Sequence, residues 1–279
     1  MIKNFSCALF LICIAYSPSI IAAERIVSIG GSITEILYEF DLQDNIIAVD
    51  TTSQYPEGTQ DKPNVGYMRT LAAEPIIAMN PDLILYLEGA GPPETIEQLE
   101  QTGINMVMVS NEHSIDGVKS KISEVAEAVG MQDKGEALSA SLDTQYQQLN
   151  EYLNGVDESA RVIFILSFDQ SSAMVAGKDT GADSIIRIAK GENVADDFKS
   201  YKPLGAESIA KLAPEYVLTT DFALRNFSSQ DEILNSPLLK LTPAAEGDNL
   251  IVMDQLLLLG YTPRVVIAAD QLAHELHTE

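Results

Sequence analysis

One sequence motif occurs twice in this chain, 133 residues apart. Its first copy is Leu-Ala-Ala-Glu at 71–74 and, after six residues, Pro-Asp-Leu-Ile-Leu at 81–85. Its second copy is Leu-Gly-Ala-Glu at 204–207 and Pro-Glu-Tyr-Val-Leu at 214–218. The distance is too long for a solenoid, whose repeats are ~20–50 residues. It predicts two half-chains built on one plan, each with a helix that begins near a glutamate and leads into a buried strand.

The first 23 residues have the features of a secretory signal peptide. Lys3 supplies a positive charge, residues 8–14 an apolar core, and residues 21–23 a small-residue cleavage site before Glu24. The apolar run is broken at 17–19, so it is too short to span a bilayer, which takes ~20 residues. A buried N-terminal strand or helix could have a similar composition. We expect a secreted protein.

Both cysteines, Cys7 and Cys13, lie in this predicted leader. Cys13 follows Ile12 rather than a small residue, so the sequence does not predict a lipid anchor. The mature chain would hold no thiol, which excludes cysteine nucleophiles, cysteine metal sites and disulfides. About 256 residues remain, enough for one large domain or two of ordinary size.

The mature chain is strongly acidic. With Lys3 removed, 16 basic residues stand against 41 acidic ones, a net charge of −25. This charge argues against nucleic acid or an anionic membrane as a partner. An acidic solvated surface that keeps a secreted protein soluble accounts for most of it. Because arginines are scarce, an arginine beside a candidate site is informative.

Short apolar runs alternate with stretches of helical periodicity, which predicts an α/β fold with mostly parallel sheets. Strands are expected at 26–29, 46–49, 83–87, 106–109, 162–166, 174–176, 216–219 and 250–253. Helices are expected at 74–79, 93–102, 115–129, 181–190, 207–212 and 263–277. Ser32 and Glu35 have the spacing of a capping box for a further helix that ends near Phe40. Pro263 suits the first turn of the last helix.

Residues 134–154 predict a single long helix between the two series. The segment is rich in Gln, Glu, Leu and Ala, contains no proline, and repeats leucine near helical spacing. Its length would be ~30 Å, about the width of a small domain. We therefore expect an N-terminal lobe at 24–131, a rigid linker helix within 132–158 and a C-terminal lobe at 159–279. A flexible Gly/Ser tether would have predicted loosely coupled lobes.

Tyr67 and Arg69 lie two residues apart in a loop just before the first copy of the repeated motif. A phenol ordinarily has a pKa near ~10, and ferric iron favours the phenolate by displacing its proton. A neighbouring guanidinium would lower that pKa further or pair with a carboxylate of a ligand. The spacing by itself is not diagnostic, since most loop tyrosines lie at the surface or at the edge of a core.

Several motifs together resemble one family. They are Ile-Val-Ser-Ile-Gly-Gly-Ser-Ile-Thr-Glu-Ile at 26–36, Asp-Thr-Thr-Ser-Gln-Tyr-Pro at 50–56, Val-Gly-Tyr-Met-Arg at 65–69, Gly-Ala-Gly-Pro-Pro at 89–93, Val-Ala-Gly at 175–177, Tyr-Lys-Pro-Leu at 201–204 and Leu-Leu-Gly-Tyr-Thr-Pro-Arg at 258–264. This set resembles the periplasmic haem-binding proteins of bacterial ABC haem importers over nearly the whole mature chain. The resemblance implies two Rossmann-like lobes joined by one long helix, with haem in the cleft between them.

The resemblance also implies roles for individual residues. Tyr67 would be the axial ligand of ferric haem. Arg69 and Arg264 would meet the haem propionates or hydrogen-bond the phenolate oxygen. Glu74 and Glu207 would form salt bridges with arginines of a permease in the inner membrane. Without the resemblance, two glutamates near helix N-termini would be ordinary partners of the helix dipole.

The chain departs from some of these relatives in its second lobe. Such relatives use a histidine near the end of the strand that matches 162–166 to help bind a second haem. Here residues 167–171 read Ser-Phe-Asp-Gln-Ser. We therefore expect one haem with five-coordinate iron, unless Met174 or another group supplies a sixth ligand. The three histidines, His113, His274 and His277, are expected at the surface rather than as ligands.

The sequence supports neither a nucleotide-binding loop nor a catalytic pair of carboxylates. Gly30-Gly31-Ser32 lacks the spacing and the lysine of a nucleotide-binding loop. Asp50 and Asp82 come without a catalytic motif and are expected to end strands or cap helices. The sequence thus predicts a monomeric binding protein and no enzyme. The alternatives are the same fold with a ferric siderophore or cobalamin, an enzyme on a nitrogenase-like scaffold, and a structural or signalling protein.

Overall fold

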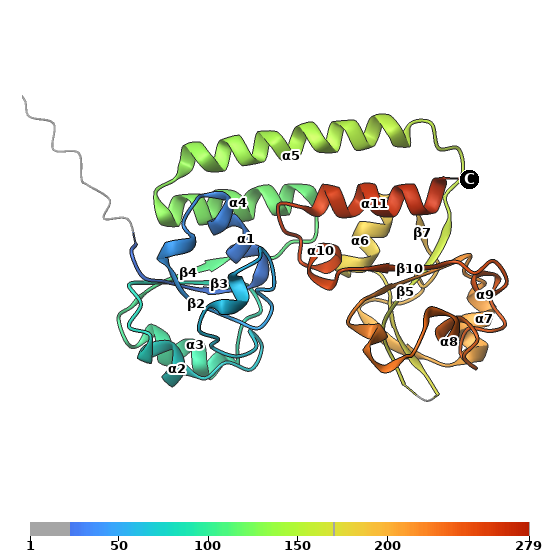
Figure 1. Cartoon of the computed structure of the whole chain (residues 1–279), viewed down its shortest axis with the longest axis horizontal. Helices are drawn as coiled ribbons and strands as arrows, with labels where there is room; N and C mark the ends of the chain where they lie inside the picture. The colour runs from blue at the N-terminus through green and yellow to red at the C-terminus, as the bar shows by residue number, and fades with distance from the viewer. Residues whose placement is uncertain (1–22, 170, 279) are drawn as a thin grey trace, which may run out of the picture.

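The computed structural model describes residues 23–169 and 171–278, which form two lobes beneath one long helix (Figure 1). The predicted signal peptide lies outside the described residues except for Ala23. In the described part, no helix combines the length and hydropathy needed to cross a membrane. The predicted α/β class with two lobes and a connecting helix is confirmed.

The N-terminal lobe is built on a parallel sheet of four strands in the order β2-β1-β3-β4. Its strands are β1 (Ile26–Ile29), β2 (Ile46–Val49), β3 (Leu83–Leu87) and β4 (Asn105–Val109). Its helices are α1 (Gly31–Glu39), α2 (Ala73–Ala78), α3 (Pro93–Glu100) and α4 (Ile115–Val129), with 3-10 turns η1 (Gln43–Asn45) and η2 (Thr59–Asp61). All four residues of the central strand β1 are buried. Strand β3 is buried nearly as completely, and burial on both faces is why these inner strands have mostly apolar sequences.

The C-terminal lobe holds a mixed sheet in the order β10-β9-β5-β6-β8, with β7 beside β5. Its strands are β5 (Arg161–Phe168), β6 (Ala173–Ala176), β7 (Glu192–Asn193), β8 (Tyr201–Leu204), β9 (Tyr216–Thr220) and β10 (Leu250–Met253). Its helices are α6 (Gly181–Ile188), α7 (Ala206–Leu212), α8 (Gln230–Leu234), α9 (Pro243–Glu246), α10 (Gln255–Leu259) and α11 (Val265–His277), with a 3-10 turn η3 (Ala223–Asn226). Strand β6 runs antiparallel to both β5 and β8, so the expected parallel sheet is only partly present here. Strand β8 was not predicted, because it is an edge strand with Pro203 and an exposed middle.

The duplicated motif has the same structure in both lobes. Helices α2 and α7 begin at Ala73 and Ala206, and strands β3 and β9 span Leu83–Leu87 and Tyr216–Thr220. The first residues of the two helices, and both ends of the two strands, are 133 residues apart, as in the repeated motif. The matching isoleucines Ile76 and Ile209 are both fully buried. The prediction of two half-chains that share a helix–strand unit is therefore confirmed.

Two expected helix starts are wrong in detail. Helix α1 begins at Gly31 after Gly30, and no side chain caps it. Ser32 lies inside the helix, where its hydroxyl accepts a hydrogen bond from Lys121, and Glu35 instead binds Arg264. The capping box fails because tertiary partners take both side chains. Helix α11 begins at Val265, so Pro263 precedes its first turn.

The long helix α5 (Gln132–Leu153) matches the expected linker and packs along both α4 and α11 (Figure 1). Leu142, Leu149 and Leu153 are buried, and Leu138 is half-buried. Helix α4 belongs to the first lobe and α11 to the second, so α5 is bound to both. This packing supports a fixed relation between the lobes. The residue numbers at which the lobes begin and end remain a prediction.

A buried lysine joins the two lobes. Lys121 of α4 is fully buried, and its ammonium donates to Ser32 Oγ at 3.1 Å, Asn111 Oδ1 at 3.3 Å and the Tyr261 carbonyl at 3.1 Å. These bonds use all three donors of the ammonium. Burial lowers the pKa of Lys121 from 10.5 to about 8, against the opposing charges of Glu124 and Glu35.

Lys121 should make the stability of the protein depend on pH. Between pH 8 and pH 10 the Lys121 ammonium is protonated in a larger fraction of unfolded chains than of folded chains. A rise in pH therefore stabilises the folded state. We expect the free energy of unfolding of the wild type to rise by roughly 2 kcal/mol over that range relative to Lys121→Met. Urea denaturation at several pH values measures the difference. Lys240→Met, at an exposed lysine, is the control, and parallel curves for wild type and Lys121→Met would contradict the prediction.

Candidate ligand-binding site

The loop that carries Tyr67 is fixed first to strand β2. Val65 N–H donates to the Val49 carbonyl at 2.9 Å, and Thr51 N–H donates to the Gly66 carbonyl at 3.0 Å. The loop therefore runs beside the carboxyl end of a strand in a parallel sheet. Ligand crevices in α/β proteins lie at this edge.

The same loop is also tied to the segment that follows β3. Gly91 N–H donates to the Met68 carbonyl, and Leu71 N–H donates to the Gly91 carbonyl, both at 2.8 Å. Gly91 belongs to the Gly-Ala-Gly-Pro-Pro motif of the sequence. Two loops that the sequence separates by about 20 residues thus form one rim of the sheet.

Local backbone shape brings Tyr67 to the surface. Gly66 has φ of +102°, in the region that favours glycine, and its N–H donates to Asn64 Oδ1 at 2.8 Å. Met68 is buried, whereas Arg69 is exposed and Tyr67 is 43 % exposed. The buried methionine anchors the loop between two exposed polar side chains. The Tyr67 side chain is thereby presented at the surface.

Arg69 lies close to residues beyond its own loop. Burial raises the pKa of Tyr201, and the nearby positive charge of Arg69 opposes that rise. Burial lowers the pKa of His113, and the charges of Lys121 and Arg69 lower it further. Tyr201 begins strand β8 of the C-terminal lobe, so the charge of Arg69 acts on a residue of the other lobe. Sequence reasoning placed Tyr201 in a family motif but assigned it no role.

Arg264 is placed differently from Arg69. Its guanidinium donates to both oxygens of Glu35, at 2.8 Å from Nε and 2.6 Å from Nη2, and lies 3.6 Å from the centre of the Tyr55 ring. The Glu35 side chain is only 3 % exposed and that of Arg264 20 %. Burial raises the pKa of Glu35, and the bond and charge of Arg264 oppose the rise. Arg264 thus connects the second lobe to the first, and a contact with a ligand stays a prediction.

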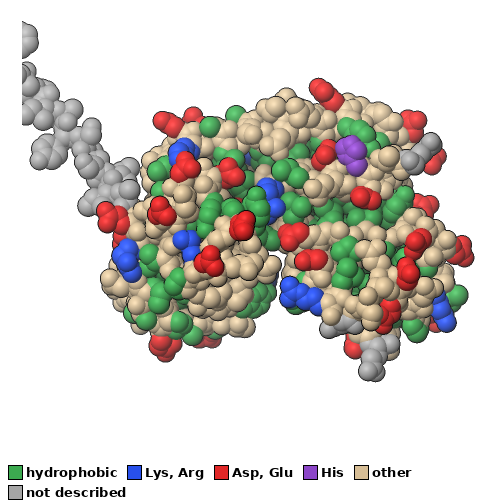
Figure 2. All heavy atoms as spheres, viewed as in Figure 1, with side chains coloured by type: hydrophobic (Ala, Val, Ile, Leu, Met, Phe, Trp, Pro, Cys, Tyr) green, Lys and Arg blue, Asp and Glu red, His purple; other side chains and the backbone are tan. Residues whose placement is uncertain are grey.

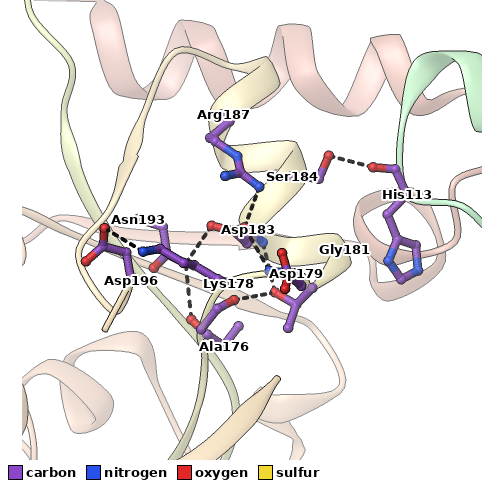
Figure 3. Close-up of polar contacts among 12 residues, drawn as sticks. His113, Ala176, Lys178, Asp179, Gly181, Asp183, Ser184, Arg187, Asn193 and Asp196 are labelled. Atoms are coloured by element: carbon purple, nitrogen blue, oxygen red, sulfur yellow. Dashed lines mark hydrogen bonds and ion pairs between the residues drawn. The ribbon is translucent and has the colours of Figure 1, made fainter. Parts of the chain in front are cut away.

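His113 also belongs to the junction between the lobes. Ser184 of α6 donates its hydroxyl to the His113 carbonyl at 2.6 Å, and the His113 ring lies 4.9 Å from that of Tyr261. Figure 3 shows His113 beside the start of α6, next to the hydrogen bonds that Asp183 forms with Arg187 and Asn193. The half-buried His113 ring therefore departs from the expected surface position.

The other two histidines lie on α11, far along the chain from the Tyr67 loop. His274 is exposed and its ring stacks on that of Tyr152 at 4.3 Å. His277 is half-buried, and its Nε2 is 3.0 Å from the Ala189 carbonyl. Among the described residues, no three His, Cys, Asp or Glu side chains are grouped to hold a metal ion.

The turn at Gly30-Gly31 brings the lobes together. A Cβ on Gly31 would lie 2.5 Å from the Thr52 carbonyl oxygen and 2.7 Å from Leu256 Cδ1 of α10. Both distances are shorter than non-bonded atoms allow, so this turn needs a residue without a side chain. Asp50 is fully buried and accepts a hydrogen bond from Gly30 N–H at 2.9 Å. As expected, this aspartate follows a strand and organises backbone.

Asp82 serves a similar purpose at the opposite end of the sheet. Its carboxylate accepts hydrogen bonds from the backbone N–H of Glu24 and of Arg25, at 3.0 and 3.1 Å. It therefore fixes the start of β1 beside β3. Asp82 lies directly before β3 and fixes the start of a strand, so the expectation that it ends a strand or caps a helix is wrong, although its role is structural.

A groove of about 360 Å³ crosses from one lobe to the other. Its lining residues are Val49, Thr51, Ser53, Gln54, Gln60, Lys62 and Asn64 of the first lobe and Arg225 of the second. Thr51 and Asn64 are the two residues that hydrogen-bond Gly66. In Figure 2 a notch separates the lobes below the layer of helices. The groove is thus continuous with the loop that presents Tyr67.

The two glutamates of the repeated motif occupy equivalent positions. Glu74 and Glu207 are each the second residue of their helix, α2 and α7, and both are exposed. Figure 1 shows these helices in different lobes and away from α5. The protein therefore presents one carboxylate on each lobe at matching places.

Comparison with known proteins places the chain in a family. The sequence profile described as periplasmic binding protein matches residues 26–257. The chain belongs to the periplasmic binding protein family. Because the family and the similar structures are non-enzymatic binding proteins, the expectation that this protein is not an enzyme is confirmed.

The similar solved structures include haem-binding proteins. RhuT from Roseiflexus sp. RS-1, a periplasmic heme-binding protein in apo form, is 34 % identical with a TM-score of 0.87, over 91 % of this chain and 98 % of that one. BhuT in complex with two hemes is 33 % identical with a TM-score of 0.86, over 90 % and 97 % of the chains. The resemblance to periplasmic haem-binding proteins is confirmed.

Sequence relatives carry other descriptions. The vitamin B12-binding protein of Vibrio campbellii is 28 % identical over 205 residues, 73 % of each chain. An uncharacterized ABC transporter substrate-binding lipoprotein of Bacillus subtilis, YvrC, is 28 % identical over 201 residues, 71 % of this chain and 64 % of its own length. The family membership is therefore shared by proteins described with different ligands.

The buried ion pair between Glu35 and Arg264 should contribute to the free energy of unfolding. Arg264→Met leaves the Glu35 carboxylate buried without its partner, and loss of one member of such a pair costs about 3 kcal/mol. We expect the free energy of unfolding in urea to fall by that amount. The control is Lys199→Met, which breaks an exposed pair with Asp179 and should leave stability unchanged. Equal losses in both variants would contradict the prediction.

Proposed function

We propose that this protein captures ferric haem in the cleft between its lobes and delivers it from the periplasm to an ABC importer in the inner membrane. The observation that carries this proposal is the position of Tyr67. Its side chain is 43 % exposed in a loop at the carboxyl edge of a parallel sheet, two residues from an arginine whose charge acts on Tyr201 of the second lobe. The proposal draws further support from the identity of 33–34 % to BhuT and RhuT over nine-tenths of the chain.

Haem is cargo in this proposal, and the protein performs no reaction on it. The Tyr67 phenolate ligates ferric iron, as tyrosine does in some haem proteins. The Arg69 guanidinium stabilises the phenolate by its charge or pairs with a propionate of the porphyrin. Neither interaction requires a resident metal or cofactor.

One haem, with the iron bound by Tyr67 on one face, is the proposed load. BhuT was solved with two hemes, but the end of β5 in this chain reads Ser-Phe-Asp at 167–169 and offers no histidine. His113, the histidine that does not lie on α11, packs against Tyr261 at the lobe junction. Met174 of β6 is half-buried and is the residue we would test first as a sixth ligand.

Cobalamin is the second candidate cargo, because several sequence relatives are described as vitamin B12-binding proteins. A ferric siderophore is a third on the same fold. The Tyr67–Arg69 pair favours haem, since a phenolate suits ferric iron and a guanidinium suits a carboxylate. Titration of the protein with haemin, cyanocobalamin and ferric siderophores, followed by absorbance, separates the three.

Tyr67 should be required for the spectrum of the haem complex. We expect wild-type protein with haemin to show the charge-transfer bands of a ferric phenolate and Tyr67→Phe to lose them. Tyr67→Ala should lose most of its affinity for haemin, and Arg69→Ala should lose less. Tyr38→Phe, at a tyrosine of α1 outside the site, is the matched control. A spectrum unchanged in Tyr67→Phe would refute the proposed iron ligand.

The paired glutamates should matter for transport and not for binding. We propose that Glu74 and Glu207 form salt bridges with arginines of the permease, one from each lobe. Glu74→Ala combined with Glu207→Ala should keep wild-type affinity for haemin while growth of cells on haem as the iron source falls at least tenfold. Glu136→Ala combined with Glu151→Ala, at exposed positions of α5, is the control pair. Normal growth of the Glu74/Glu207 double variant would exclude these residues as docking points.

A further inference from the structure

The sheet of the C-terminal lobe ends at a strand that leaves part of its backbone unpaired. Strand β10 is the last strand in the order β10-β9-β5-β6-β8 and pairs in parallel with β9. The Asn249 carbonyl, just before β10, accepts a hydrogen bond from Val217 N–H at 3.0 Å. The Met253 carbonyl, at the end of β10, accepts one from Asp221 N–H at 3.0 Å. Because alternate residues of a strand bond to the same neighbour, the N–H and C=O of Val252 point away from β9.

This edge lacks the charge and the proline that protect exposed strands from pairing with another chain. Natural sheet edges often carry charged residues, especially lysine, or proline. Strand β8, at the opposite edge of the same sheet, has both, as Lys202 and Pro203. Strand β10 reads Leu-Ile-Val-Met and has neither. The outward backbone groups of β10 can therefore pair with an added strand.

A groove of about 530 Å³ runs along this edge. Besides the four residues of β10, it is lined by Gln230 at the start of α8 and by one face of α11, with Asp270, Gln271, His274 and Glu275. Both β10 and α11 belong to the C-terminal lobe (Figure 1). Ile267, one turn earlier on the same face of α11, is 42 % exposed. An extended segment in this groove would contact the edge strand on one side and α11 on the other.

The charge of the groove indicates which kind of segment it accepts. Asp270 and Glu275 line it, and none of its described lining residues is a lysine or arginine. In the part of the chain that the structure describes, Glu275 takes part in no ion pair, and Asp270 only in an approach of 3.7 Å to His274 Nδ1. Such carboxylates favour a segment with positive side chains. A second copy of this chain, paired edge to edge, would bring like charges together.

We propose that the groove between β10 and α11 is a docking surface for another protein, which adds an extended segment bearing lysine or arginine to the edge of the sheet. The backbone of that segment exchanges hydrogen bonds with Val252, and its basic side chains meet Asp270 and Glu275. None of the residues that line this groove also lines the groove between the lobes. The partner can therefore bind whether or not the cleft holds cargo.

The probe is a capped eight-residue peptide of alternating valine and lysine, titrated against the whole protein. Fluorescence anisotropy of the labelled peptide measures affinity, and hydrogen exchange in NMR spectra reports on the Val252 amide. We expect saturable binding with a Kd below about 1 mM and slower exchange at Val252. The same peptide methylated at every backbone nitrogen keeps its charge and loses its donors, and it should bind at least tenfold more weakly.

Two variants test the backbone and the charge separately. Val252→Pro removes the outward N–H and spares the ladder with β9, because proline is tolerated on an edge strand where the N–H faces solvent. Asp270→Asn combined with Glu275→Gln removes both charges from the surface of α11 and keeps the side-chain shapes. Each should weaken binding of the peptide about tenfold. Circular dichroism checks folding, and if Val252→Pro does not fold, the double variant and the methylated peptide decide the outcome.

Glu136→Gln combined with Glu151→Gln is the matched control for charge. Both glutamates are exposed on α5, outside the groove, so the net charge changes by the same amount. We expect wild-type affinity for the peptide. An equal loss in this control pair would show general attraction between a basic peptide and an acidic protein, and the proposed surface would be wrong.

The other outcomes are equally decisive. The proposal is overturned if the peptide does not bind saturably, if a folded groove variant binds it as tightly as wild type, or if the methylated peptide binds as well. Sedimentation of the protein alone tests for self-pairing: a dimer that Val252→Pro dissociates would mean that a second copy fills the groove, and the basic partner would be wrong. None of these measurements uses haemin, so they stand apart from the proposed function.

Discussion

The buried polar contacts between the lobes are the constraint on which the rest of the structure depends. Glu35 and Arg264 meet through two hydrogen bonds, and Lys121 donates across the same junction to the Tyr261 carbonyl. Removing charged groups from water is costly, and they are tolerated inside a protein when they are paired with good geometry. These contacts have well-defined directions, so they favour one relative orientation of the lobes over others. The cleft is therefore formed before any ligand arrives.

The long helix and the cleft follow from that fixed orientation. Helix α5 packs along α4 and α11, which belong to different lobes, and so bridges the junction from outside. On the other side the carboxyl edge of the first sheet carries the loop of Tyr67 and Arg69, and in the second lobe η3 with Arg225 follows β9. Residues of both lobes line the groove between them. A ligand between them can be held from both lobes without a large movement of either one. This arrangement suits a protein that captures cargo and passes it on unchanged.

The elements that the sequence predicted well are those whose signal is local. Strands β2 and β3 and helix α4 have the predicted bounds, because apolar runs and helical periodicity reflect burial directly. Strand β8 was missed because an edge strand with proline has no such pattern. The capping box at Ser32 and Glu35 was misread for a related reason, since both side chains have distant partners that outcompete the local one. The resemblance to haem-binding proteins gave the Tyr67 loop, and Arg225 had no signal in the sequence.

By itself the sequence determined the α/β class, the duplicated helix–strand unit, the long linking helix and the family, because each is encoded in periodicity, spacing or motif within a short window. Only the tertiary structure decided which charged groups meet. Glu35 and Arg264 are 229 residues apart in the chain, and Lys121 and Tyr261 are 140 apart. Pairings at such separations arise from the packing of whole elements, and no local pattern records them. The same packing commits Arg264 to the lobe junction and places Arg225 in the lining of the groove between the lobes.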